Sequence, residues 1–367
     1  MTYINGVRHL RPEAHRPFVA ERLLALKQRL RHEIHDVSDE HSLRLATWNL
    51  MHFGDGGAYR RTTESMLYIA EIIDHFDLVA IQEVNQNLTS LEYLFGRHLR
   101  GDWDYIVTDT TGGSMGNKER LAFAYRRSKV WFRKEAGEIV LPSGQEIADP
   151  GAEQVGRKVQ FARTPFSVAF QSGWFKFKLC TVDISYGKNV EDSPELEQRR
   201  REIARIAEFL AARQEDQEKT LGDEANFILL GDFNIISPEH RTMQALEDAG
   251  FTIPQAIKDA PSSLSGKHHY DQIAFRLADR RFEFRQAGVF DMFDAVYRDE
   301  DADQYIDVVK PPSFEEGSNG QPRSREQKAR YYRTYYRKHQ MSDHKLLWCE
   351  IKTDFSEDYL RQVSEEA

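Results

Sequence analysis

The chain has 367 residues, with 50 Lys and Arg against 59 Asp and Glu, which gives a formal net charge of −9. Hydrophobic residues make up 40% of the sequence and charged residues 30%, a balance that supports a sizeable core and excludes global disorder. The longest uncharged apolar stretches are far short of the roughly 20 residues that a membrane helix needs. The N-terminal residues lack the apolar segment of a secretory signal. We therefore expect a cytoplasmic protein without a membrane span, and the net acidity argues against broad, charge-driven nucleic-acid binding.

The predicted elements begin with a helix within residues 11–40, where apolar residues recur at helical spacing. Short apolar runs then predict strands, in chain order, at Leu43–Asn49, Leu78–Gln82, Tyr105–Thr108, Leu121–Tyr125, Phe166–Phe170, Phe175–Ile184, Phe227–Leu230, Tyr270–Phe275 and Lys345–Ile351. Helical patterns predict helices at Thr62–His75, Pro194–Arg213, Pro238–Ala249 and Arg325–His339. Many short strands interleaved with few helices indicate an α/β (α+β) protein with two packed sheets and outer helices.

Two further features concern the organisation of the chain. The acidic stretch Arg298–Asp307 is interpreted as a solvated insertion, and no linker composition divides the sequence into two domains. Cys180 and Cys349 each lie in an apolar, strand-like run. Two cysteines cannot form a disulfide framework, so we expect buried, reduced thiols.

Polar residues follow or precede several predicted strands, and they carry the functional signal. They are Asn49, Glu83, Asp232 with Asn234, Asp271, and Asp343 with His344. Each alone is a weak signal, because a carboxylate at a strand end caps a loop more often than it binds a ligand. Together they would converge in stacked sheets, where carboxylates repel one another unless a cation lies among them. A hard divalent cation, Mg²⁺ or Mn²⁺, fits such oxygen ligands and suits phosphoryl or phosphodiester chemistry.

In this order and over this span, the motifs LRLATWN, IQEV, GDFN, YDQI and SDH resemble those of the endonuclease/exonuclease/phosphatase superfamily. The stretches GNKERLAFAYRRSKV and FARTPFSVAF are similar to the nuclease branch. The resemblance implies a deoxyribonuclease-I-like fold, a four-layer sandwich of two mixed β-sheets flanked by helices. It covers residues 43–352, which leaves an N-terminal helical extension (1–42) and a C-terminal tail (353–367).

The resemblance also implies roles for individual residues. Glu83 would be the principal ligand of one or two metal ions, with Asn49 beside it and Asp343 completing the shell. Asp232 would hold or deprotonate the attacking water, and Asn234 would orient that water or the phosphate. Asp271 would fix the tautomer of His344, whose other ring nitrogen would face the scissile phosphate. Arg163 would neutralise phosphate charge, with a surface salt bridge as the alternative, and Glu119 would support a second catalytic residue.

The sequence departs from the family at two positions. Most hydrolytic members carry a second His in a motif like Thr-x-His-Leu, where this chain has Asp183, so Glu119 would face a second carboxylate. Asp183 could be protonated, could join a second cation site, or could impair catalysis, and we expect reduced activity. The other position is Asn117, near which the minor-groove-reading nuclease has an aromatic side chain, so that mode of binding a DNA duplex is in doubt.

A basic segment precedes the Ser-Asp-His motif. Residues Arg323–Lys338 carry seven basic side chains and one acidic side chain. On a helical wheel Arg330, Arg333 and Arg337 share one face, and four tyrosines share the other. The segment is interpreted as a basic surface for a polyphosphate backbone, or as a helix whose tyrosines pack on the domain while its arginines are solvated. The run from Arg199 to Arg201 is interpreted as an exposed helix face.

These observations predict a metal-dependent nuclease, and they favour DNA over RNA as its substrate. A phosphatase or phosphodiesterase acting on a small phosphoester or a phospholipid headgroup is the alternative enzyme. A catalytically impaired member that binds nucleic acid or a protein is the third hypothesis, and Asp183 is the residue that supports it.

Overall fold

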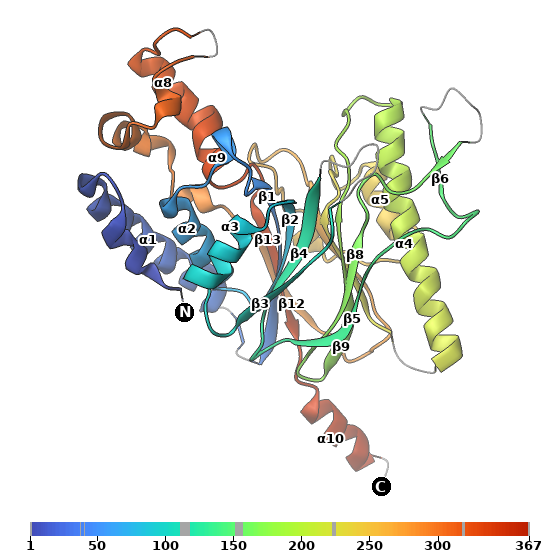
Figure 1. The fold of residues 1–367 in the computed structure, drawn as a ribbon. Helices are drawn as coiled ribbons and strands as arrows, with labels where there is room; N and C mark the ends of the chain where they lie inside the picture. Colours follow the sequence, from blue (N-terminus) through green and yellow to red (C-terminus); the bar gives the residue numbers. More distant parts are fainter. Residues whose placement is uncertain are drawn as a thin grey trace.

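The computed structural model describes residues 2–36, 38–39, 41–110, 118–150, 157–221, 225–317 and 320–365. Two β-sheets lie face to face, and helices cover their outer faces (Figure 1). This confirms the predicted four-layer sandwich. Within the described residues, no helix combines the length and the apolar character that a membrane crossing requires.

The first sheet has six strands and is mixed. In spatial order they are β12 (Phe284–Phe290), β13 (Leu346–Lys352), β1 (Ser42–Phe53), β2 (Leu78–Asn85), β4 (Glu119–Arg126) and β3 (Trp103–Val107). Only β1 and β2 are parallel, and the other neighbours are antiparallel.

The second sheet has five strands and contains one parallel pair as well. Its order is β11 (Asp271–Arg276), β10 (Phe227–Asp232), β9 (Phe175–Asp183), β8 (Phe166–Ser172) and β5 (Trp131–Glu138). The parallel pair is β9 with β10. A separate two-stranded ribbon joins β6 (Ile147–Ala148) to β7 (Lys158–Val159).

The alternation of side chains along β1 explains why both faces of the first sheet are buried. Leu43 and Leu45 point between the two sheets, whereas Ala46, Trp48 and Leu50 join the cluster under the outer helices. Between the sheets, the Phe123 ring lies 5.5 Å from that of Phe166. A continuous apolar strand thus serves two cores at once.

The helices divide between the two outer faces (Figure 1). Apolar residues of α1 (Arg16–Leu30) and α2 (Thr63–Ile73) cover the first sheet. Those of α4 (Pro194–Leu221) and α5 (Arg241–Glu247) pack with the second sheet. The other α-helices are α3 (Thr89–Tyr93), α6 (Gln255–Lys258), α7 (Ala302–Gln304), α8 (Arg325–Tyr331), α9 (Arg337–Gln340) and α10 (Ser356–Glu365).

Two edge strands, β5 and β12, lie outside the strands that the sequence predicts. An edge strand needs no continuous apolar run, and most residues of β5 are exposed. The solvated insertion predicted at Arg298–Asp307 is wrong, because Asp301 and Tyr305 are buried and Asp301 accepts hydrogen bonds from Arg22 of α1. Both cysteines are buried and free, as expected.

A polar contact joins the two sheets below one end of the sandwich. The buried Gln82 amide of β2 donates to the Thr47 hydroxyl at 3.0 Å and to the Thr181 hydroxyl of β9 at 2.9 Å. Because this contact is buried and satisfied, it fixes the relative positions of the three strands. The strand ends just beyond it carry the polar residues described next.

Candidate active site

Three aspartates form a row across the second sheet. Asp232 at the end of β10 pairs in register with Asp183 of β9 and with Asp271 of β11. Residues paired in register project from the same face of a sheet. Asp183 continues the alternation through Leu179 and Thr181, so the row lies between the two sheets, at one end of the sandwich.

A glycine precedes Asp232 because β10 approaches β9 closely there. Gly231 has a φ of +130°, and a Cβ atom at this position would lie 2.2 Å from the carbonyl oxygen of Val182. Only glycine fits both the backbone angle and the space. The Gly-Asp pair of the GDFN motif therefore has a steric origin.

Asp271 and His344 form a buried dyad. The Nδ1 atom of His344 lies 2.8 Å from Oδ2 of Asp271, and its Nε2 atom lies 3.7 Å from Oδ2 of Asp232. The His344 carbonyl accepts from the Trp48 indole, and the Ser342 hydroxyl accepts from the His344 amide. Burial opposes protonation, but the charges of Asp271 and Asp232 outweigh it and raise the pKa of His344. We call Asp232, Asp271 and His344 the Asp232 cluster; their ligand atoms lie within 4.8 Å of one another.

Asn49 connects this cluster to Glu83 of the first sheet. Its Nδ2 donates to Glu83 Oε1 at 2.9 Å and to Asp232 Oδ2 at 3.1 Å, and its Oδ1 accepts from the Met51 amide. Glu83 has a φ of +58° at a bulge of β2, which turns its side chain toward Asn49. Burial raises the pKa of Glu83, but the Asn49 hydrogen bond and the His52 charge outweigh it, so the pKa is lowered.

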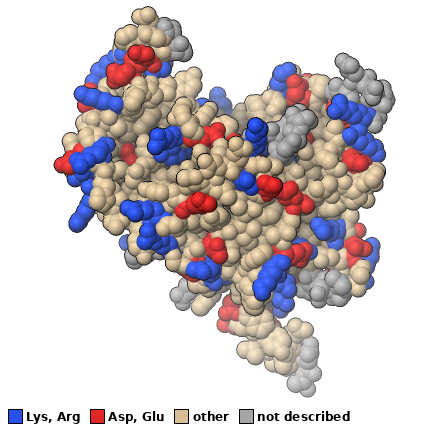
Figure 2. All heavy atoms as spheres, in the orientation of Figure 1, with Lys and Arg blue, Asp and Glu red and all other residues tan. Residues whose placement is uncertain are grey.

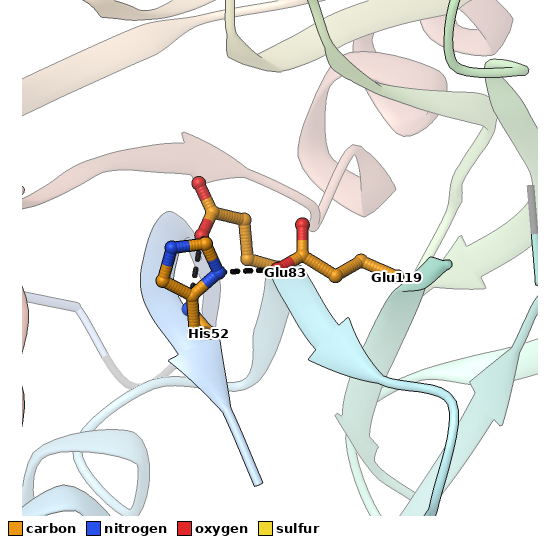
Figure 3. Close-up of side chains that lie close together, drawn as sticks. All are labelled: His52, Glu83 and Glu119. Atoms are coloured by element: carbon orange, nitrogen blue, oxygen red, sulfur yellow. Dashed lines mark hydrogen bonds and ion pairs between the residues drawn. The ribbon is translucent and has the colours of Figure 1, made fainter. Parts of the chain in front are cut away.

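His52 completes a second group of ligand atoms, which we call the Glu83 cluster (His52, Glu83 and Glu119). Its Nδ1 lies 2.6 Å from Glu119 Oε1 and 3.4 Å from Glu83 Oε2, and its backbone amide donates to Glu83 (Figure 3). The Glu119 hydrogen bond and the Glu83 charge raise the pKa of His52 to about 9 despite its burial. His52 is not among the site residues that the sequence predicts. The available signal is its position three residues after Asn49, at the end of a predicted strand.

Asp183 and Arg163 form an ion pair between the two clusters. A guanidinium nitrogen of Arg163 donates to Asp183 Oδ1, and the Arg163 side chain is largely buried. Glu119 contacts His52 and Asp183 contacts Arg163, and the charge of Glu119 still raises the pKa of Asp183. The alternative of a surface salt bridge for Arg163 is wrong, because its ion pair with Asp183 is largely buried.

The pKa shifts reflect crowding of buried carboxylates. Burial raises the pKa of Glu119, of Asp183 and of Asp232, the last to about 7. The charge of Arg163 opposes the shift at Asp183, and Glu83 and Asp232 add to it. So much negative charge in one buried place is costly to ionise, and a bound cation lowers that cost.

The other predicted residues lie around these groups. Asn234 has a φ of +52°, and its Nδ2 donates to the Ile184 carbonyl while its amide donates to Asp232. Asp343 is half-buried beside His344. The predicted exposed position of Arg199 is wrong, because its guanidinium is buried and donates to the Asn234 carbonyl at 2.9 Å. Asn117 lies outside the described residues.

The basic segment leads directly into residues that lie near Tyr59 and Thr62: Gln340 of α9 accepts from the Thr62 amide, and His339 contacts the Tyr59 ring. Its arginines do not form one free face. Arg337 is paired with Asp299 at 2.7 Å, and Arg333 donates to the Asp299 carbonyl. Arg330 is mostly exposed, with a loose contact to Glu326 at 3.9 Å. Figure 2 accordingly shows basic and acidic side chains side by side on this part of the surface.

The tyrosines of the basic segment also differ from one another. Tyr332 and Tyr336 are buried, whereas Tyr335 is half exposed. Arg325 pairs with Asp303 and Asp307, both of which belong to the acidic stretch. The acidic and basic stretches are therefore largely partners of each other.

Comparisons with known proteins agree with this fold. Solved structures with a TM-score of 0.50 include the mannosyl-6-phosphatase of Bacteroides thetaiotaomicron, at 17% identity over 84% of this chain and 99% of that chain. The human Nocturnin catalytic domain with bound sulfate has the same TM-score, at 12% identity over 87% of this chain and 97% of that chain. A comparison with curated protein sequences gave no match. The model of the Endonuclease/Exonuclease/phosphatase family matches residues 46–344, so the chain belongs to that family.

Proposed function

We propose that this protein is a divalent-metal-dependent hydrolase of phosphodiester bonds. The observation that carries the proposal is the convergence of Glu83, Glu119, Asp183 and Asp232 near one arginine, Arg163, at the end of the sandwich. Such a site combines acceptors for a hard cation with a guanidinium for phosphate oxygens. Membership of a family named for nucleases and phosphatases supports the same chemistry.

The donor set fits Mg²⁺ or Mn²⁺. It consists mainly of carboxylate oxygens, and the buried Asp271 Oδ1 atom has no hydrogen-bond partner among the described residues. We propose Glu83 as the principal ligand, with Asp343 near it. Asn49 as oriented donates to both carboxylates, so the ligand role predicted for it requires the opposite orientation of its amide. A bound cation would supply Lewis-acid stabilisation of the phosphate oxygens.

The protein's own groups account for the other parts of the reaction. We propose that Asp232 accepts the proton of the attacking water, because its pKa of about 7 suits a base near neutral pH. Asn234, held by Asp232 and Ile184, would orient the water or the phosphate. Asp271 would orient His344, with its Nε2 facing the scissile phosphate. Asp183 would hold Arg163 in place to contact a phosphate oxygen.

We propose nucleic acid as the substrate, DNA before RNA. The exposed side chains of Arg330 and Tyr335 support this choice, since they offer a cation and a ring to a nucleotide chain. A small phosphoester is the second candidate. The ion pairs that neutralise Arg325 and Arg337 favour it, because a site for a small substrate needs no extended basic surface.

The experiment measures Mg²⁺-dependent hydrolysis of plasmid DNA, of bis(4-nitrophenyl) phosphate and of 4-nitrophenyl phosphate, with and without EDTA. Chelator-sensitive nicking of the plasmid supports the nuclease. Cleavage of 4-nitrophenyl phosphate alone supports the second candidate. Retarded but uncut DNA contradicts both and supports a binding protein. Glu83→Gln distinguishes activity at this site from a contaminating nuclease, because only activity at this site is lost with it.

A further inference from the structure

His52 has the features of a residue that is held for contact with a ligand. Its side chain is 37% exposed, and one ring nitrogen, Nδ1, is fixed by Glu119 at 2.6 Å. The other ring nitrogen, Nε2, makes no hydrogen bond to any described residue. The edge of the ring contacts the Tyr59 ring, with centroids 4.7 Å apart. The imidazole is therefore restrained on one side and available on the other.

The backbone that presents His52 is held in an unusual conformation. Met51 and His52 have φ values of +43° and +51°, in the left-handed region that costs non-glycine residues about 1 kcal/mol or more each. The buried Arg61 guanidinium donates to the carbonyls of Leu50, Met51 and Met341, and so clamps this bulge of β1. Strained backbone of this kind is concentrated at active sites and ligand sites, which supports a role for His52 beyond packing.

The neighbours of His52 lie where a substrate phosphate would be bound. The charge of Arg163 acts on Glu83 and Glu119 in the Glu83 cluster, and on Asp232 in the other cluster. Arg163 therefore lies near carboxylates of both clusters, one of which contains His52 and the other His344. Asp183 is already engaged by Arg163, whereas the exposed Nε2 of His52 has no hydrogen-bond partner among the described residues.

We propose that His52 is a catalytic residue, whose Nε2 contacts a non-bridging oxygen of the substrate phosphate on the side opposite His344. Glu119 is its positioning residue and acts only through the imidazole. This inference rests on the proposed phosphoester hydrolase function. It gives the site two carboxylate-held histidines, one from each end of the carboxylate array, with the Arg163 guanidinium between them.

The test compares His52→Ala, His52→Gln, Glu119→Gln and the double variant His52→Ala/Glu119→Gln, with His32→Ala as an exposed-histidine control. The readouts are kcat and KM for bis(4-nitrophenyl) phosphate and the Kd for Mg²⁺ from calorimetry. We expect His52→Ala to lower kcat about 100-fold while the Kd for Mg²⁺ changes less than about threefold. His52→Gln keeps an N–H near the Nε2 position and should retain more activity than His52→Ala.

The double variant separates positioning from folding. If Glu119 acts only through His52, Glu119→Gln lowers kcat in the wild-type background and has no further effect in the His52→Ala background. A His52→Ala protein with at least half of the wild-type kcat would overturn the inference and leave the proposed function intact. So would a loss that saturating Mg²⁺ fully restores, because it would make His52 a support of the metal site. A wild-type protein without phosphoesterase activity overturns the proposed function itself, and the inference with it.

Discussion

The Glu83 cluster and the Asp232 cluster meet at the same end of the sandwich, but the backbone builds them differently. The Asp232 cluster follows from regular pairing, since Asp183, Asp232 and Asp271 lie in register on neighbouring strands. The Glu83 cluster depends on irregular backbone, with bulges in β1 and β2 and positive φ values at His52 and Glu83. Regular strand pairing thus positions one set of candidate ligand side chains, and the strained, irregular backbone positions the other.

The two clusters also differ in exposure. Asp232, Asp271 and His344 are all buried, and Asn49 lies between them and Glu83. The side chains of His52 and Glu83 are 37% and 16% exposed. We propose a division of labour that follows this difference, in which the deeper cluster transfers protons and the more open cluster binds the cation and the substrate.

The largest expected effect tests this division directly. We expect Glu83→Gln to lower kcat/KM about 1,000-fold by weakening Mg²⁺ binding. We expect Asp232→Asn to lower kcat while leaving the Kd for Mg²⁺ nearly unchanged. Kinetics with calorimetric Mg²⁺ titration check both, with Glu357→Gln on α10 as the control. Equal losses of Mg²⁺ affinity in the two variants would show that the clusters form one metal site.

The regular geometry of the Asp232 cluster has a steric requirement. We expect Gly231→Ala to lower the free energy of unfolding by about 3 kcal/mol, because its Cβ would lie 2.2 Å from the Val182 carbonyl oxygen. Gly137→Ala in the edge strand β5 is the matched control, since no atom lies within 4 Å of its Cβ position. Urea denaturation measures both variants, and equal stabilities would contradict the close approach of β9 and β10.

The dyad within the Asp232 cluster should matter for turnover more than for binding. Asp271→Asn removes the charge that holds His344 in its tautomer, so we expect kcat to fall about 100-fold with little change in KM. Steady-state kinetics on bis(4-nitrophenyl) phosphate provide the measurement. Full activity of the variant would exclude His344 from the chemical step.

The smallest effect concerns the stability of the metal-free protein. The pKa of Asp232 is raised from 3.8 to about 7, so between these pH values the folded protein holds a proton that the unfolded chain has lost. The free energy of unfolding therefore falls as the pH rises from about 4 to 7. Asp232→Asn should flatten this fall, and Asp358→Asn on α10 should not. Melting curves in EDTA from pH 4 to 8 test this, and an unchanged slope in Asp232→Asn would contradict the shift.

The sequence by itself determined the fold class and most of the candidate site. Apolar runs that end beside Asn49, Glu83 and Asp232, and one that begins just after Asp343, showed which side chains stand at strand ends, because the residues of a buried strand form a local pattern. The family motifs were local as well. Edge strands such as β5 were not predicted, because a strand that pairs on one side only needs no continuous apolar run of residues.

Only the tertiary structure decided which of these groups touch. The pairing of Asp183 with Arg163 and of Glu119 with His52 joins residues that are 20 and 67 positions apart, and no local pattern records it. Two other features also depend on contacts between residues that are distant in the sequence. Arg199 donates to the Asn234 carbonyl, and the acidic and basic stretches neutralise each other. Strand register, bulges and packing fix these contacts, and they depend on the whole sandwich.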